Sequence, residues 1–354
     1  MANTKSDSGF FSRKGLHPSF KLYFIDAMGA MAQGLFASLL LGTILGTLAK
    51  YIPGFSFLAD IAAFAQNGYV VGAAIGIAVA FALGAKGLLL YTASVVGAIG
   101  YSLQVGGVEY TAGPAGAFVA VIAAVELTKI VHKSTKVDII VTPLAETLIG
   151  YGVSLLVCPA IGRAMAWLGN FINTATEMQP FLMGVIISVV VGMILTLPIS
   201  SAAICSMIGI AGIAGGAATA GCCAQMMGFA VMSFRENRVG GLVAQGLGTS
   251  MLQMGNIVRH PQIWIPPTLA AAVTGPLATL VFKLECGGVA AGMGTCGFVG
   301  PLGIVSAMSG HMDAMAWVGI VLLCFVAPSV LTLVFSEIMR KLVLIKADYL
   351  RLEL

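Results

Sequence analysis

The chain has 354 residues and a formal net charge of +4, and 58% of its residues are hydrophobic while only 9% are charged. In soluble globular proteins about a quarter of all residues are charged, so the composition excludes that class. It also excludes a disordered chain and a nucleic-acid-binding protein, because the net charge is small and the basic residues are scattered between apolar stretches. The sequence therefore predicts an all-α polytopic membrane protein.

Apolar stretches recur along the whole length. A helix needs about 20 apolar residues to cross the bilayer core. The first candidate, Phe20–Leu48, follows a polar segment, is too long for a signal-peptide core and contains Asp26, so we interpret it as a retained span. The candidate spans are 20–48, 68–84, 86–105, 112–131, 139–168, 181–199, 203–234, 262–284 and 312–339.

Shorter pieces between these spans fit a crossing poorly. The glycine-rich stretch Gly287–Gly294 exposes too much backbone for a lipid-facing helix, which predicts a re-entrant loop surrounded by protein. The polar stretch Phe171–Gln179 predicts a helix at the membrane interface or a connection between two structural halves. We place a domain boundary there, between residues 20–170 and 180–340. The short pieces, which include these two stretches, are 55–67, 167–179, 246–260 and 286–310.

Clusters of basic residues predict the orientation of the chain. By the positive-inside rule these clusters are cytoplasmic, which places both ends of the chain inside as tails of residues 1–19 and 341–354. Both ends on one side require an even number of crossings, and we expect about ten transmembrane helices. The clusters are Arg13, Lys14 and Lys21; Lys129, Lys133 and Lys136; Arg235 and Arg238; and Arg340, Lys341, Lys346 and Arg351.

Glu146 is an ionisable residue inside a predicted span. Counted from Lys136, it lies roughly ten residues, or some 15 Å, along its helix, near the middle of the membrane. Such a residue either lines a polar path or is hydrogen-bonded within the bundle. In the first case, low dielectric favours the neutral carboxyl, so Glu146 is a candidate carrier of a coupling proton.

Two segments hold candidate substrate-binding residues. The segment GLGTSMLQMGNIVRHPQIWIPP, residues 246–267, has the glycines and prolines of a re-entrant hairpin, and amide and guanidinium groups suit a ligand rich in hydroxyl or carboxylate oxygens. The alternative is that its basic residues snorkel at the surface. The segment Thr196–Ser201 ends a span with a proline and two hydroxyls, which is typical of a broken helix at a binding site or of an ordinary loop. The candidates are Ser200, Ser201, Gln253, Asn256, Arg259 and His260.

The sequence offers no sign of a metal or cofactor site. The four histidines are far apart, no HExxH, GxSxG or Walker motif occurs, and the glycine runs lie between apolar helices, where close helix packing is their expected role. The seven cysteines are an odd set without a CxxC pair, which predicts buried free thiols. We therefore expect no cofactor and no enzyme activity of the chain alone.

Three long segments carry a resemblance to a known family. They are KSTKVDIIVTPLAETLIGYGVSLLVCPAIGRAMAWL from Lys133, PFLMGVIISVVVGMILTLPISSAA from Pro180 and RENRVGGLVAQGLGTSMLQMGNIVRHPQIWIPPTLAAAVTGPLA from Arg235. They resemble the membrane subunit IIC (EIIC) of the bacterial phosphotransferase system (PTS), in its glucose-fructose superfamily. The resemblance covers residues from about 115 to 310. It is closest to a divergent branch that includes membrane regulators of the PfoR type.

Two family motifs are changed in this chain. Where relatives carry Gly-Gly-Pro-x-Asn-Lys, residues 196–201 share only Pro198. Where they carry a substrate-binding glutamate in Thr-Glu-Gly-Ala-Ile-Pro-Phe, this chain has Ser250, Met251 and Leu252. The phosphorylated His or Cys of IIA and IIB units is absent too, so these would be separate partner proteins, or the solute crosses without phosphorylation.

The resemblance implies a homodimeric transporter in the bacterial cytoplasmic (inner) membrane. It would move a small polar organic solute, a sugar or a similar molecule, by an elevator mechanism. Residues 20–170 would form the scaffold and dimer contact, and residues 180–340 the moving transport domain. A membrane sensor that retains the fold is the alternative, and a membrane-embedded enzyme ranks third. Short tails leave little room for a signalling domain, which favours transport.

Overall fold

The computed structural model describes residues 19–134 and 137–352. These residues are almost entirely helical, and the one sheet among them has two short strands, which confirms the all-α membrane class. The predicted tail at residues 1–19 lies outside the described residues except for Ser19, as do Lys136 and the last two residues of the other tail.

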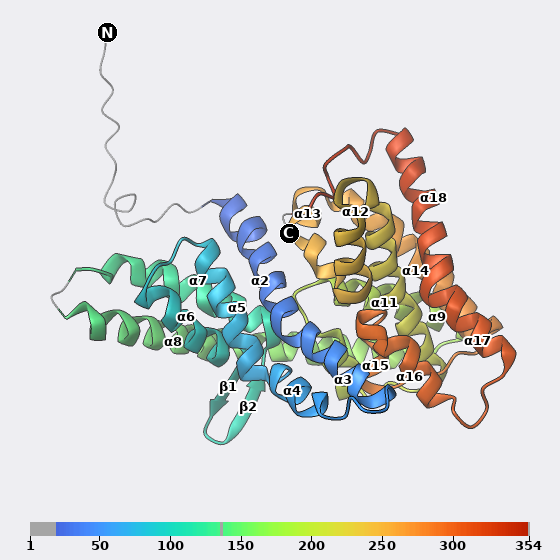
Figure 1. The fold of residues 1–354 in the computed structure, drawn as a ribbon, viewed down its shortest axis with the longest axis horizontal. Helices are drawn as coiled ribbons and strands as arrows, with labels where there is room; N and C mark the ends of the chain where they lie inside the picture. Colours follow the sequence, from blue (N-terminus) through green and yellow to red (C-terminus); the bar gives the residue numbers. More distant parts are fainter. Residues whose placement is uncertain (1–18, 135–136, 353–354) are drawn as a thin grey trace, which may run out of the picture. The chain divides into compact units, whose positions relative to one another are not determined.

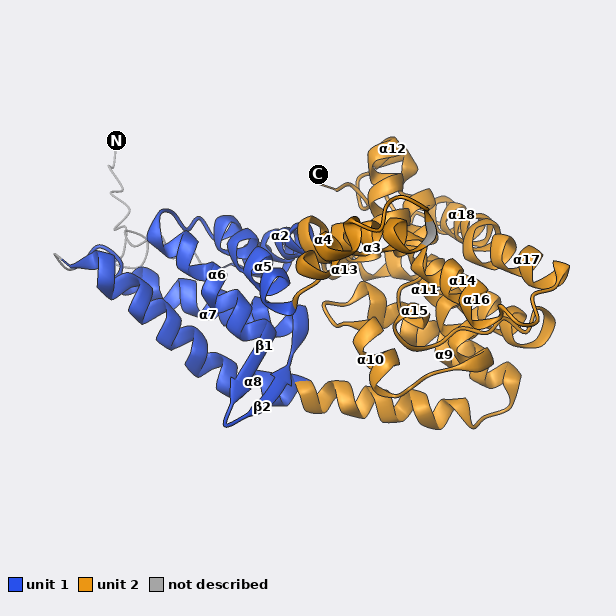
Figure 2. Ribbon diagram, turned by 60° about the horizontal axis from the view of Figure 1, so that its bottom comes forward, with its two compact units in different colours: residues 1–35, 68–161 blue, residues 36–67, 162–354 orange. Residues whose placement is uncertain are grey.

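The helices form two compact units, coloured separately in Figure 2. Unit 1 comprises Met1–Leu35 and Gly68–Ile161, and unit 2 comprises Phe36–Asn67 and Gly162–Leu354. The chain passes from one unit to the other at three points. The third point lies inside a single helix, α8 (Asp138–Thr176), which contributes to both units.

Unit 1 is a bundle in which small residues bring helices close together. A side chain at Gly76 of α5 would collide with the carbonyl group of Ala93 on α6, and Gly72, four residues earlier, faces Gly97 in the same way. This spacing is typical of closely packed membrane helices. Besides the first part of α8, unit 1 contains η1 (Leu22–Asp26), α2 (Ala27–Leu35), α5 (Gly68–Ala82), α6 (Leu88–Tyr101), β1 (Ser102–Val105), β2 (Val108–Thr111) and α7 (Gly113–Val131).

The β-hairpin of unit 1 replaces the end of a predicted span. The span predicted at 86–105 ends as helix α6 at Tyr101, and the chain then forms the antiparallel pair β1 and β2. Gly106 and Gly107 both have positive φ, 58° and 81°, which a two-residue hairpin turn of this kind requires. The hydropathy pattern placed these residues near a loop but did not predict the strands.

Unit 2 is built around α11 (Gly212–Met232), which is buried over nearly all its length. It packs against α9 (Pro180–Thr196), α14 (Ile265–Pro276) and α18 (Ala327–Lys341), as Figure 1 shows. The other elements of unit 2 are η2 (Phe36–Leu40), α3 (Leu41–Tyr51), α4 (Leu58–Ala65), α10 (Ser201–Met207), α12 (Phe234–Val243), η3 (Ala244–Gly248), η4 (Ser250–Gln253), α13 (Met254–Arg259), η5 (Pro261–Trp264), η6 (Leu277–Val281), α15 (Gly288–Ala291), η7 (Cys296–Phe298), α16 (Val299–Ala307), α17 (Ala314–Val321) and η8 (Leu322–Val326).

Two predicted elements differ from the helices observed. The single span predicted at 203–234 is divided into α10 and α11, because Gly209 and Gly212 adopt positive φ and interrupt the helix. Conversely, the short piece predicted at 167–179 is the continuation of α8, which runs to Thr176 in spite of prolines at 143 and 159.

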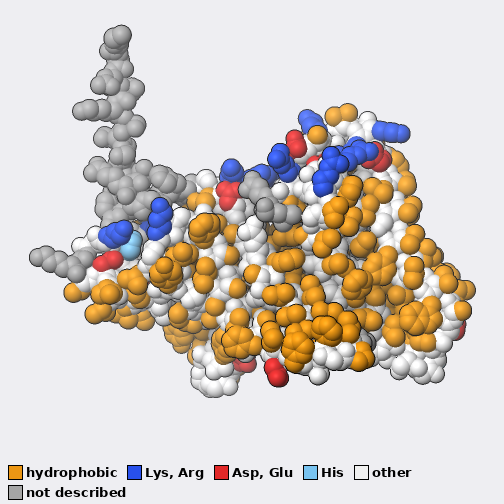
Figure 3. All heavy atoms as spheres, in the orientation of Figure 1, with side chains coloured by type: hydrophobic (Ala, Val, Ile, Leu, Met, Phe, Trp, Pro, Cys, Tyr) orange, Lys and Arg blue, Asp and Glu red, His pale blue; other side chains and the backbone are white. Residues whose placement is uncertain are grey.

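Several helices in the described part of the chain are long and apolar enough to span a membrane. There are five, or six if α4 and α5 together form one span, and the number of about ten crossings stays a prediction. The five are Leu22–Lys50, Gly113–Val131, Asp138–Thr176, Pro261–Val281 and Ala314–Lys341. Large apolar side chains are exposed along these helices, as a lipid-facing surface requires, and Figure 3 shows them over the sides of unit 2, with basic side chains gathered near α12.

Candidate functional site

The two predicted binding segments meet inside unit 2, at the end of α9. Thr196 is the last residue of α9, and Leu197 is extended because the following Pro198 disfavours a helical residue before it. The hydroxyl of Thr196 lies 2.8 Å from that of Ser250, the first residue of η4. Both residues are fully buried.

Gln225 connects this pair to two further elements. It lies in the middle of α11 and is fully buried. Its Oε1 accepts hydrogen bonds from the indole of Trp264 at 3.0 Å and from Thr196 at 3.5 Å. Its Nε2 donates to the hydroxyl of Thr268 at 3.1 Å, and Thr268 donates to the carbonyl of Trp264. We call Thr196, Gln225, Ser250, Trp264 and Thr268 the Gln225 network.

The Gln225 network has the composition of a site for a hydroxyl-rich ligand. Hydroxyls can donate and accept, the amide offers both functions in a fixed plane, and the half-buried Trp264 adds a flat apolar surface. The sequence prediction, which selected polar side chains in segments broken by glycine and proline, did not include Gln225, Trp264 or Thr268. A single amide in the apolar run GCCAQMMG, residues 221–228, was the signal that could have identified Gln225.

Three of the predicted residues lie together, at a second polar cluster in unit 2. Gln253 is buried and donates to the carbonyl of Leu350 at 3.0 Å, and Asn256 donates to the carbonyl of Arg351 at 2.9 Å. The ring of His260 stacks on that of Tyr349, with 3.6 Å between their centres. Partial burial, followed by the charge of Arg259, lowers the pKa of His260.

The other predicted residues have different surroundings. Arg259 is exposed. Ser200 caps α10 by accepting from the amide of Ala203, and the buried Ser201 donates to the carbonyl of Gly292 at 2.7 Å. Within the described residues, no hydrogen bond joins either serine to Asn256, and a common binding site for the three residues stays a prediction.

Glu146 lies in unit 1, on the buried side of α8. Its side chain is fully buried, and neither carboxyl oxygen has a hydrogen-bond partner among the described residues. The buried positions at four-residue spacing along this helix are Thr142, Glu146, Gly150, Ser154 and Cys158, all small or polar. For the alternative of a hydrogen bond within the bundle, the described residues thus offer Glu146 no partner.

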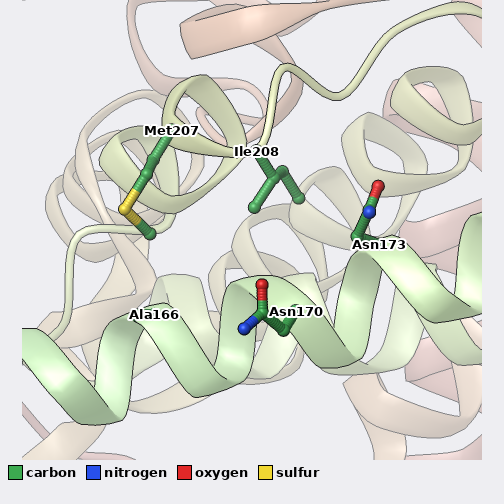
Figure 4. A pocket seen from close by; sticks show the side chains of 5 residues that line it. All are labelled: Ala166, Asn170, Asn173, Met207 and Ile208. Atoms are coloured by element: carbon green, nitrogen blue, oxygen red, sulfur yellow. The ribbon is translucent and has the colours of Figure 1, made fainter.

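A pocket of about 180 Å³ lies elsewhere in unit 2, between the last part of α8 and α10 (Figure 4). The side chains of Asn170 and Asn173 extend from α8 toward those of Met207 and Ile208. This pocket contains none of the predicted site residues. It is lined by Ala166, Asn170, Asn173, Met207 and Ile208.

All seven cysteines are free and buried, which confirms the prediction of buried free thiols. Within residues 19–134 and 137–352, no group of three or more His, Cys, Asp or Glu side chains is arranged to hold a metal ion.

Comparison with known proteins places the chain in a family. The family model described as "Phosphotransferase system, EIIC" matches residues 25–352. No curated protein and no solved structure matches the chain.

Proposed function

Because this chain belongs to the phosphotransferase system EIIC family, a family of membrane transporter components, we propose that it carries a small polar organic solute, a sugar or a sugar-like molecule, across the bacterial cytoplasmic membrane. EIIC components are not catalytic on their own. Phosphorylation of the solute would therefore need separate IIA and IIB proteins. Transport without phosphorylation would need another source of driving force.

The Gln225 network is the observation that carries this proposal. In an apolar chain, buried hydroxyl and amide groups are costly unless they are hydrogen-bonded, so a transporter keeps them where a polar solute is to be held. Here five polar side chains from five elements meet where α9 ends and a chain of short helices begins, and three of them are fully buried. The break after α9 also leaves backbone hydrogen-bonding groups available to a solute beside the Gln225 network.

An elevator movement fits the division of the chain. Residues 20–170 would form a scaffold that dimerises, and residues 180–340, which include the whole Gln225 network, would carry the solute. Residues 180–340 all lie within the compact unit 2, which also includes residues 36–67 from the first half, and this compactness supports a domain that moves as one body. Both ends of the chain would face the cytoplasm.

A membrane sensor is the second candidate function. The stretch Ser250–Leu252 has no acid where phosphotransferring relatives carry a glutamate, so a protein that binds its ligand without transport is consistent with the sequence. Such a sensor would bind a solute at the same network and would show no accumulation.

The test is solute uptake into proteoliposomes that contain the purified protein. A panel of sugars, sugar alcohols and sugar acids is offered with and without a proton or sodium gradient. We expect saturable uptake of one class. Gln225→Met, which keeps volume and removes the amide, should lower that uptake at least tenfold, because the hub of the network loses all its hydrogen bonds.

Two further variants separate binding from folding. Trp264→Phe keeps an aromatic ring and removes only the N–H donor, so it should raise KM more than it lowers the maximal rate. Gln104→Met removes an exposed amide on β1 that donates to Tyr69, and uptake should be unchanged. Binding of a solute without any flux would select the sensor, and neither binding nor flux across the panel would refute the proposal.

A further inference from the structure

The segment Ile345–Leu352, which we call the tail segment, is held against unit 2 through its main chain. Asn237 of α12 makes two hydrogen bonds to it: Nδ2 donates to the carbonyl of Leu350 at 2.7 Å, and Oδ1 accepts from the amide of Leu352 at 2.8 Å. A side-chain amide that bonds the backbone on both sides of one residue recognises the main chain and not a particular side chain.

Two more amides complete this contact. Gln253 donates to the same carbonyl of Leu350, and Asn256 donates to the carbonyl of Arg351. Their orientation is fixed by a relay of bonds, since Asn256 donates to Gln253, Gln253 to Gln245, and Gln245 to Ser233. The three amides therefore form a preorganised main-chain-binding site.

Apolar contacts anchor the two ends of the tail segment. Ile345 and Leu350 are buried with Phe229, Ile257 and Met339 in one cluster. Tyr349 covers the ring of His260. Figure 1 shows the end of the described chain beside α12 and α13.

The docked conformation also contains strained backbone. Val343 and Asp348, which flank the anchor Ile345, have φ of 60° and 68°. Residues with a Cβ rarely adopt this region, and for the β-branched Val343 it is a clear outlier. Undocking relieves this strain, so the docked tail segment is less stable than the helices beneath it.

The geometry assigns to Asn237, Gln253 and Asn256 a peptide-binding site whose ligand is the tail segment of the same chain, and makes this segment a strap that undocks while the rest of unit 2 stays folded. Docking occupies donors of Gln253 and Asn256 and covers His260. Undocking makes these three side chains available to a ligand. That this ligand is a polar solute rests on the proposed function; the strap itself does not.

Hydrogen–deuterium exchange on the full-length protein in nanodiscs tests the strap. Amides of residues 345–352 should exchange by local opening, at least tenfold faster than those of α11. Asn237→Ala, which removes two hydrogen bonds, should accelerate the tail segment by a further factor of about ten and leave α11 unchanged. Asn170→Ala removes an exposed amide outside this site and should change neither.

A chemical probe reports the groups beneath the strap. Diethyl pyrocarbonate modifies neutral imidazole, and peptide mapping gives the rate for each histidine. Asn237→Ala should raise the rate at His260 several-fold and leave that at the exposed His311 unchanged.

The strap is refuted if the tail segment exchanges as slowly as α11, if Asn237→Ala leaves both rates unaltered, or if it accelerates α11 equally. No arm of this test uses a transported solute, so failure of the strap is distinguishable from failure of the transport proposal.

Discussion

A carboxyl group without a hydrogen-bond partner is costly inside an apolar bundle, and Glu146 is such a group. Its cost is lowest when it is protonated, because a neutral carboxyl loses less solvation than a carboxylate. If it is retained for stability, a hydrogen bond should be visible, and none is formed among the described residues. Of the two roles predicted for it, we propose the first, as the carrier of a coupling proton on a polar path.

Glu146→Gln separates these roles. We expect the variant to melt at the wild-type temperature, to keep solute counterflow and to lose accumulation driven by a proton gradient. Glu177→Gln, at an exposed position directly after the end of the same helix, should retain both activities. Uptake and counterflow in proteoliposomes over a range of pH measure the difference. Accumulation by Glu146→Gln equal to wild type at every pH removes Glu146 from the mechanism.

His260 makes docking of the tail segment sensitive to pH. Partial burial and the charge of Arg259 lower its pKa in the folded protein below the ordinary value of about 6.5. Undocking removes the burial but not the neighbouring charge of Arg259, so the open state binds more protons than the docked state, and docking weakens as the pH falls through the lowered pKa. Exchange of residues 345–352 should accordingly become faster at pH 5 than at pH 7.

His260→Phe keeps a ring against Tyr349 and removes the titrating group. In this variant the exchange rate, corrected for intrinsic chemistry, should be the same at both pH values. An acid dependence that persists without His260 would assign the effect to another group.

At the level of single residues, the sequence located the polar segments better than their partners. Ser250 and Thr196 lie in segments with proline and glycine, and these residues indicate a broken helix even before a structure is known. Gln253 and Asn256 were selected for their amides, yet the groups they bind are about a hundred residues away in the chain. No local pattern encodes such a pairing, because it depends on how α18 returns the chain to α12.

Close approach of α9 and α11 depends on a glycine in each helix. A Cβ at Gly221 would collide with the backbone of Ser188, and Gly192 faces Gly221 in turn. Gly221→Ala must therefore move the helices apart or distort them, at a cost of about 1–3 kcal/mol. We expect a lower melting temperature, measured with a thiol-reactive fluorogenic maleimide that reports exposure of the buried cysteines on unfolding.

Gly162→Ala on α8 is the matched control, since no atom lies within 4 Å of the added Cβ. There alanine should leave the melting temperature unchanged or raise it slightly, because alanine has the higher helix propensity. Equal melting of the two variants would contradict the close contact at Gly221.

The helices themselves were predictable where hydrophobicity alone decides the outcome. The spans predicted at 112–131 and 181–199 correspond to α7 and α9 within about three residues. The break between α10 and α11 was missed because it depends on the φ angles of Gly209 and Gly212, and glycine at these positions reads as ordinary helix packing. The hairpin after α6 was missed because its strands are short and mostly exposed.

At the scale of the whole molecule, the proposed scaffold predicts where two copies meet. Ile77 and Phe81 on α5 present exposed apolar side chains from a helix of the first half. A cysteine introduced at either position should cross-link two copies in membranes, and Val318→Cys, at an equally apolar exposed site on α17, should not. The native cysteines are buried and give little background. Cross-links at Val318 alone, or at none of the three positions, would contradict a dimer formed by the first half.

The continuity of α8 has a mechanical consequence. A helix of 39 residues is about 58 Å long, nearly twice the hydrocarbon thickness of a bilayer. Its bending stiffness is not uniform, because Pro159 has no N–H to donate to the carbonyl of Leu155. This compliant point lies two residues before the division between unit 1 and unit 2 at Ile161 and Gly162. At this one of the three crossings, a change in the direction of the helix then requires only a few backbone torsions of α8 to change.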